Sequence, residues 1–109
     1  MRSRYLVSIF LLLVVVPLLL FALENGDADK GKEVYRRCSV CHGADGKGNE
    51  AMAKMLEVTM PALDSKEVQS LDDAALKKVI VEGKGKMTAV KLSDPEVEDV
   101  IAYLRSLKK

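Results

Sequence analysis

Histidine, cysteine and tryptophan are scarce in this sequence of 109 residues, which contains one His, two Cys and no Trp. A structural zinc site usually takes four Cys or His ligands, so the three present cannot complete one. The two cysteines, Cys38 and Cys41, are so close in sequence that a disulfide between them would close a tiny loop and stabilise little. Alternation of apolar and polar residues is never sustained, which argues against the βαβ setting of a thioredoxin-like dithiol.

The first part of the chain is an apolar segment with a basic start. Arg2 and Arg4 precede a stretch over residues 5–23 that is almost wholly apolar. This pattern predicts a signal peptide or an N-terminal membrane anchor over residues 1–23, with the two arginines on the cytoplasmic side. No good cleavage pattern follows, which favours the anchor and leaves cleavage open. Either outcome predicts a periplasmic or otherwise extracytoplasmic location for the rest of the chain.

Residues 24–109 are predicted to form one soluble domain, because the composition there becomes charged and polar. Arg2 and Arg4 account for two of the 17 basic residues in the chain, which leaves 15 in this domain against 16 acidic ones. A domain so close to neutral is not expected to bind nucleic acid. Its only aromatic residues are Tyr35 and Tyr103. Such a thin core usually needs a staple, a metal or a cofactor, and we expect a large apolar group to fill it.

The domain is predicted to be all-α, with four short helices. Their expected ranges are 27–37, 49–57, 72–82 and 93–107. Asp27 or Asp29 is expected to cap the first helix, and Ser70 or Asp72 the third. The clearest start is the capping box that begins at Ser93, which is followed by apolar residues at helical spacing.

The segment that indicates chemistry is the pentapeptide from Cys38 to His42. It places two thiols one helical turn apart, at the spacing that reaches both vinyl groups of a haem. The residue directly after Cys41 then offers an imidazole to the iron. We therefore predict one covalently attached haem c at Cys38, Cys41 and His42.

Four methionines of the domain are candidates for the second axial ligand of the iron. Met52 and Met55 share one side of a short predicted helix and are expected to fill the core. Met60 is a weaker candidate that is expected to line the haem pocket. Met87 follows a predicted helix end in a segment with two glycines, which would let the backbone run close to a flat cofactor. We therefore assign Met87 as the distal ligand. A closed His/Met site would leave the iron no open position for a substrate, raise its potential and favour electron transfer.

The sequence resembles the class I cytochrome c family, in particular its small bacterial and photosynthetic-type members. The similarity extends over residues 27–107. It rests on the segments 31–35, 38–48, 83–87, 92–96 and 99–104.

The resemblance implies the class I cytochrome c fold, in which the first and last helices cross. Gly31 and Tyr35 would meet the last helix near Val100 and Tyr103, since a glycine lets two helices approach closely. It also implies thioether bonds at both cysteines, proximal ligation by the histidine and distal ligation by the methionine of the second glycine segment. Thr88 departs from the family, which commonly has proline after the ligand methionine.

We expect the protein to be a monomeric one-electron carrier between larger redox proteins, not an enzyme, and to require haem c. The exposed lysines Lys47, Lys84, Lys86 and Lys91 flank the expected haem edge and could steer an acidic partner. Two alternatives stay open. One is a haem-based ligand binder or peroxidase-like protein with a labile distal methionine. The other is a subunit of an oxidase or dehydrogenase complex tethered to the membrane through residues 5–23.

Overall fold

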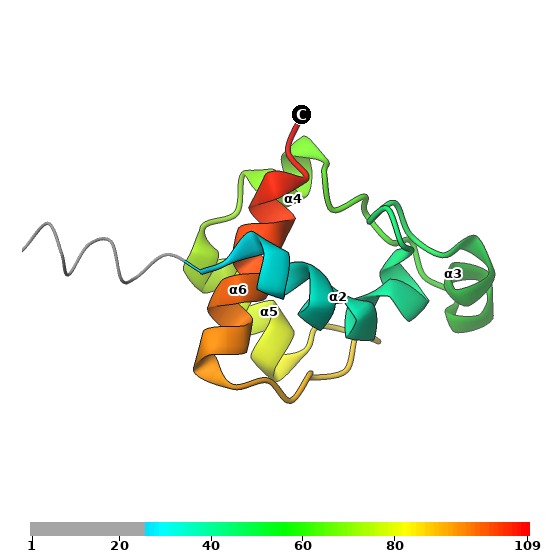
Figure 1. The fold of residues 1–109 in the computed structure, drawn as a ribbon. Helices are drawn as coiled ribbons and strands as arrows, with labels where there is room; N and C mark the ends of the chain where they lie inside the picture. The colour runs from blue at the N-terminus through cyan, green and yellow to red at the C-terminus, as the bar shows by residue number, and fades with distance from the viewer. Residues whose placement is uncertain (1–25) are drawn as a thin grey trace, which may run out of the picture.

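The computed structural model describes residues 26–109, which form a helical domain (Figure 1). The predicted signal peptide or anchor over residues 1–23 lies outside the described residues. Within the described part, no helix is both long enough and apolar enough to cross a membrane. That part contains five helices: α2 (Ala28–His42), α3 (Glu50–Leu56), α4 (Lys66–Gln69), α5 (Asp73–Glu82) and α6 (Asp94–Ser106). The all-α prediction is confirmed.

Each helix begins where a short polar side chain can accept a hydrogen bond from the first turn. The residues that do so are Asp27, Asn49, Ser65, Asp72 and Ser93. These oxygens satisfy backbone N–H groups that have no partner within the helix. Of the alternatives open in the sequence, Asp27 caps the first helix and Asp72 caps α5. The capping box at Ser93 is confirmed in both directions.

The crossing of α2 and α6 is the main contact of the fold (Figure 1). A Cβ atom on Gly31 would overlap the backbone carbonyl of Asp99 and lie 2.9 Å from the Cβ of Tyr103. The rings of Tyr35 and Tyr103 pack beside this contact, with centroids 5.1 Å apart. The absence of a side chain at Gly31 therefore lets the two helices touch through their backbones, as the resemblance implied.

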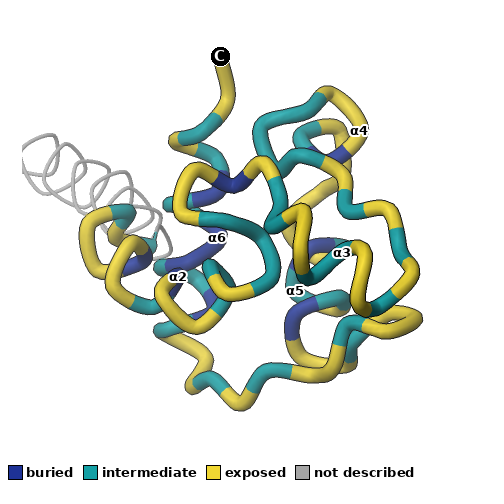
Figure 2. Tube along the Cα trace, turned by 90° about the vertical axis from the view of Figure 1, so that its right-hand side faces the viewer, coloured by how far each residue is buried: buried dark blue, intermediate teal, exposed yellow. Residues whose placement is uncertain are grey.

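The buried core lies along α6 and extends to the two helices beside it. Figure 2 shows buried residues along α2 and α6, and others on α5 and α4. Val97 and Val100 are the most deeply buried side chains, at 0% and 1% exposure. Leu76 and Ile80 bring the apolar side of α5 against them. Helix α3 contributes no buried residue.

Two elements differ from the sequence prediction. Helix α2 continues to His42 instead of ending near residue 37, so the cysteines lie on the helix itself. Helix α4 was not predicted, because it has four residues and only Val68 is buried. Polar contacts hold it: the Gln69 side chain donates to the Leu63 and Leu104 carbonyls, each at 2.8 Å. A contact of this kind leaves no periodic signal in the sequence.

Candidate functional site

Cys38, Cys41 and His42 occupy the last turn and a half of α2. All three side chains are half-buried, and the two cysteines form no disulfide with each other. Burial is the largest influence on Cys38 and raises the pKa of its thiol. The helix fixes the spacing between the two sulfurs, because residues three apart lie on the same side of a helix.

The loop over residues 43–49 closes the end of this helix. The amide and side-chain nitrogens of Asn49 donate to two carbonyls of the last turn, at 2.8 and 3.0 Å, and the Gly48 amide donates to the His42 carbonyl at 2.7 Å. The hydroxyl of Tyr35 donates a hydrogen bond to the carbonyl of Gly43, the first residue of the loop, at 2.6 Å. A helix end whose carbonyls all have partners does not fray, so the loop holds the His42 backbone in place.

The imidazole of His42 has the properties of a metal ligand. Burial lowers the pKa of His42 below its usual value, which favours the neutral ring. The neutral ring is the form that binds a metal. Its Nδ1 atom is buried and has no hydrogen-bond partner within residues 26–109.

Met87 lies in a tight turn that follows α5. Gly83 ends α5 at φ 79°, and Lys84 and Met87 then exchange two backbone hydrogen bonds of 3.0 and 2.9 Å. A Cβ atom on Gly83 would lie 2.6 Å from the Met87 carbonyl oxygen. The backbone that carries this thioether is therefore folded closely onto the end of α5.

The segment that follows Met87 and the helix that carries the cysteines are in contact through Arg37. Cys38, Val90 and Leu92 all pack against the core cluster. The guanidinium of Arg37 also donates to the Lys91 carbonyl at 3.1 Å. The structure thus brings the end of α2 and the segment that follows Met87 together.

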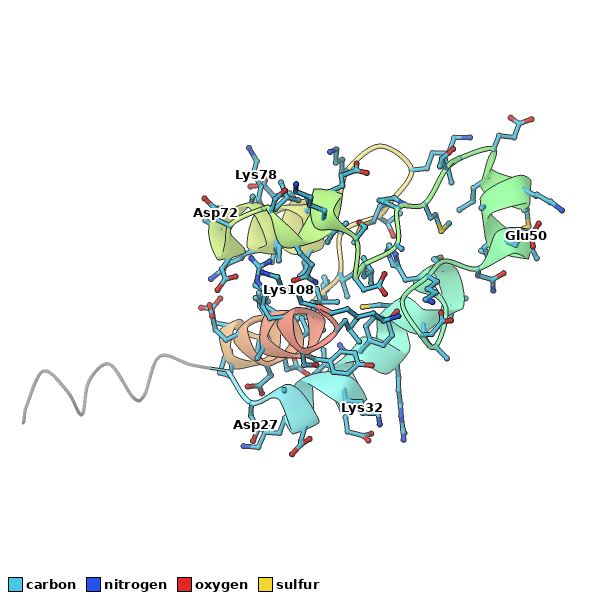
Figure 3. The ribbon with its side chains drawn as sticks, turned by 90° about the horizontal axis from the view of Figure 1, so that it is seen from above. Asp27, Lys32, Glu50, Asp72, Lys78 and Lys108 are labelled. Carbon is cyan, nitrogen blue, oxygen red and sulfur yellow. The ribbon has the colours of Figure 1, made fainter. Side chains whose placement is uncertain are left out.

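The remaining methionines lie on and after α3. The prediction that Met52 and Met55 fill the core is wrong: Met52 is half-buried, Met55 is 67% exposed, and neither belongs to the core cluster. The reason is that α3 lies at one end of the molecule and makes its main contact with α2, and not with α5 or α6. Figure 3 shows its first residue, Glu50, far from Asp27 and Asp72. Met60 lies against Gly48, beside the loop that closes α2.

These residues fit a haem of the c type. Two thiols at helical spacing, a neutral imidazole and a thioether are the side chains that such a group takes. Apolar side chains also remain uncovered in the same region, since Val40 is 62% exposed and α3 buries none of its residues despite its methionines. A large flat apolar group held by α2 would give these side chains the cover that the protein core does not supply.

Comparisons with known proteins indicate the same cofactor. A family model described as Cytochrome c matches residues 28–108. Among solved structures, the chain is similar to the KustC0563 c-type cytochrome, with 27% identity and a TM-score of 0.60. That similarity covers 72% of this chain and 98% of the other. No curated protein matches this chain. The chain therefore belongs to the cytochrome c family, with its all-α fold and its covalently bound haem c.

Proposed function

We propose that the protein is a one-electron carrier with a single haem c. Cys38 and Cys41 would hold the haem through thioether bonds, with His42 as the proximal ligand and Met87 as the distal ligand. A haem held in this way supplies a one-electron ferric/ferrous couple. The observation that carries the proposal is the turn from Lys84 to Met87, which fixes the thioether-bearing backbone against Gly83.

The residues around the site support electron transfer because they fix the backbone of both proposed ligands, which would keep a substrate from the iron. The loop over residues 43–49 holds His42 from one side, and the turn at Met87 is held by its own hydrogen bonds and by α5. Held on fixed backbone, His42 and Met87 would leave a bound haem iron no open position for a substrate. Neutral imidazole and thioether ligands also add no charge to the site, and the thioether raises the potential of the couple.

The partners we propose are larger redox proteins, one as electron donor and one as acceptor, met by a monomer outside the cytoplasm. Four exposed lysines flank the two loops and form no ion pair within residues 26–109. They are Lys47, Lys84, Lys86 and Lys91. Unpaired lysines can attract an acidic surface on a partner and speed encounter with it. The apolar segment over residues 5–23 would either direct export or tether the domain at the outer face of the membrane.

Carbon monoxide binding to the reduced protein tests the closed site. We expect slow, incomplete binding to the wild-type protein, because Met87 must leave the iron first, and fast binding to a Met87→Ala variant. Met60→Ala is the matched control, since it removes another methionine near the helix end, and it should behave as wild type. Fast binding to the wild-type protein would contradict the carrier and favour the ligand binder.

Fractionation of cells that express the full chain tests the tether. A tethered protein stays with the membrane in high salt and is released by detergent, whereas a cleaved carrier is found in the soluble extracytoplasmic fraction. Salt screens exposed charges but leaves apolar insertion intact, so the two treatments separate the two kinds of attachment.

A further inference from the structure

Arg37 is the residue directly before the first cysteine, and it reaches across to the segment that follows Met87. One of its terminal nitrogens donates to the Lys91 carbonyl at 3.1 Å. The other lies 3.9 Å from a carboxylate oxygen of Glu96, at the start of α6. Arg37 therefore joins α2, the loop after Met87 and the first turn of α6.

Glu96 holds this guanidinium from a fixed position. Its second carboxylate oxygen accepts a hydrogen bond from the Ser93 amide at 2.8 Å, as half of the capping box. The capping box thus fixes the carboxylate that faces Arg37. The Lys91 carbonyl lies two residues before Ser93, so both groups that face Arg37 belong to the junction between the loop and α6.

The loop depends on few other attachments. Met87 is bonded to Lys84 within its own turn, and the Val90 amide donates to the Ile80 carbonyl at 2.9 Å. Between these points lie Thr88 and Ala89, both exposed. These three backbone bonds attach the loop to itself or to α5, so none of them holds it against the helix that carries the cysteines.

We propose that Arg37 is a positioning residue that holds the Met87 loop against α2 and thereby limits how often Met87 leaves the iron. The inference rests on the proposed distal ligation by Met87. Thr88 lacks the fixed φ that proline would give at this position. The bond from Arg37 to the Lys91 carbonyl supplies a constraint from outside the loop.

The expected effect is modest because the contact is partly exposed. The Arg37 side chain is 57% exposed and that of Glu96 37%, and an exposed ion pair at this distance contributes little. The hydrogen bond to the backbone carbonyl is the larger contribution, since its donor is charged. We expect its loss to raise the fraction of molecules with Met87 detached by about two- to fivefold.

Imidazole binding to the oxidised, haem-loaded protein measures that fraction. Imidazole can bind the iron only when Met87 has left, so the apparent Kd varies inversely with the detached fraction. For Arg37→Gln we expect an apparent Kd about two to five times lower than for the wild-type protein. Arg37→Lys keeps a charged donor without the planar fork, and its value should fall between the two.

Arg36→Gln is the matched control. Arg36 is the neighbouring arginine on the same helix, and its ion pair is a 3.3 Å contact with Glu33 within α2. We expect its imidazole affinity to equal that of the wild-type protein. Denaturant unfolding of each variant is measured in parallel, because a merely structural role would lower global stability and leave the imidazole affinity unchanged.

The outcomes separate this inference from the proposed function. If Arg37→Gln binds imidazole no more tightly than Arg36→Gln, Arg37 does not position the loop. If the wild-type protein binds imidazole as tightly as Met87→Ala, distal ligation by Met87 is wrong and the proposed function fails with it. A lower apparent Kd for Arg37→Gln alone, with Met87→Ala tightest of all, supports both.

Discussion

Gly83→Ala should weaken the bond from Met87 to the haem iron more than a glycine-to-alanine substitution elsewhere in the same turn. Gly83 has φ 79° and ψ 173°, a region of backbone space that is almost restricted to glycine and costs about 1–3 kcal/mol for other residues. Its new Cβ would also lie 2.6 Å from the Met87 carbonyl oxygen and 3.0 Å from the Ala89 amide nitrogen. Relieving that overlap costs about 1–3 kcal/mol more and moves the Met87 backbone.

Gly85→Ala is the control for this prediction. Gly85 also has a positive φ, 57°, but a Cβ there would meet nothing within 4 Å. Its substitution should therefore cost only the left-handed backbone, about 1–2 kcal/mol. Denaturant unfolding of both haem-loaded variants gives the free energies, and the oxidised spectrum reports the bond from Met87 to iron. If Gly83→Ala and Gly85→Ala lose equal stability and have the same spectrum, the close approach at Gly83 does not hold the turn.

Three further substitutions test the frame around the site, all by denaturant unfolding. Gly31→Ala should lower the free energy of unfolding by about 1–2 kcal/mol, because overlap with the α6 backbone outweighs the better helix propensity of alanine. An unchanged denaturant midpoint would contradict the backbone contact. Asp27→Ala should lose about 1 kcal/mol as the N-cap, with Asp29→Ala losing less; the reverse order would assign the cap to Asp29. Burial, as the largest cause, raises the pKa of Tyr35 from 10.0 to about 12, so the folded protein keeps a proton that the unfolded chain loses in this range. The free energy of unfolding of the wild-type protein should therefore fall between pH 10 and 12 more steeply than that of Tyr35→Phe, which lacks the hydroxyl bonded to Gly43. Parallel curves for the two proteins would contradict this prediction.

The parts of the fold that could be predicted from sequence are those with strong local signals. The structure confirms the capping box at Ser93 and the predicted end of the third helix at residue 82, where Gly83 follows α5. The crossing of Gly31 and Tyr35 with the last helix followed from the family resemblance, and it is also confirmed. These features could be predicted because each depends on one side chain, or on the lack of one, within a single turn or at a single close contact.

The parts that could not be predicted depend on contacts that reach beyond one helical turn and follow no sequence periodicity. Helix α2 extends to His42 because a loop donates to its last carbonyls, and α4 exists because Gln69 bonds to carbonyls on both sides. Met55 was expected in the core because it is apolar and lies on a helix, but α3 makes its main contact with α2 and packs against neither α5 nor α6. The hydrogen bond from Arg37 to the Lys91 carbonyl, in the loop that follows Met87, likewise had no local signal in the sequence.

The assignment of Met87 as distal ligand remains a prediction, and the absorption spectrum of the oxidised, haem-loaded protein tests it most directly. A sulfur-to-iron bond gives a far-red band. We predict that this band is present in the wild-type protein and in Met60→Ala and is absent in Met87→Ala. A wild-type spectrum without the band, or a band that survives in Met87→Ala, would contradict the central claim that a His42/Met87 site makes this protein an electron carrier.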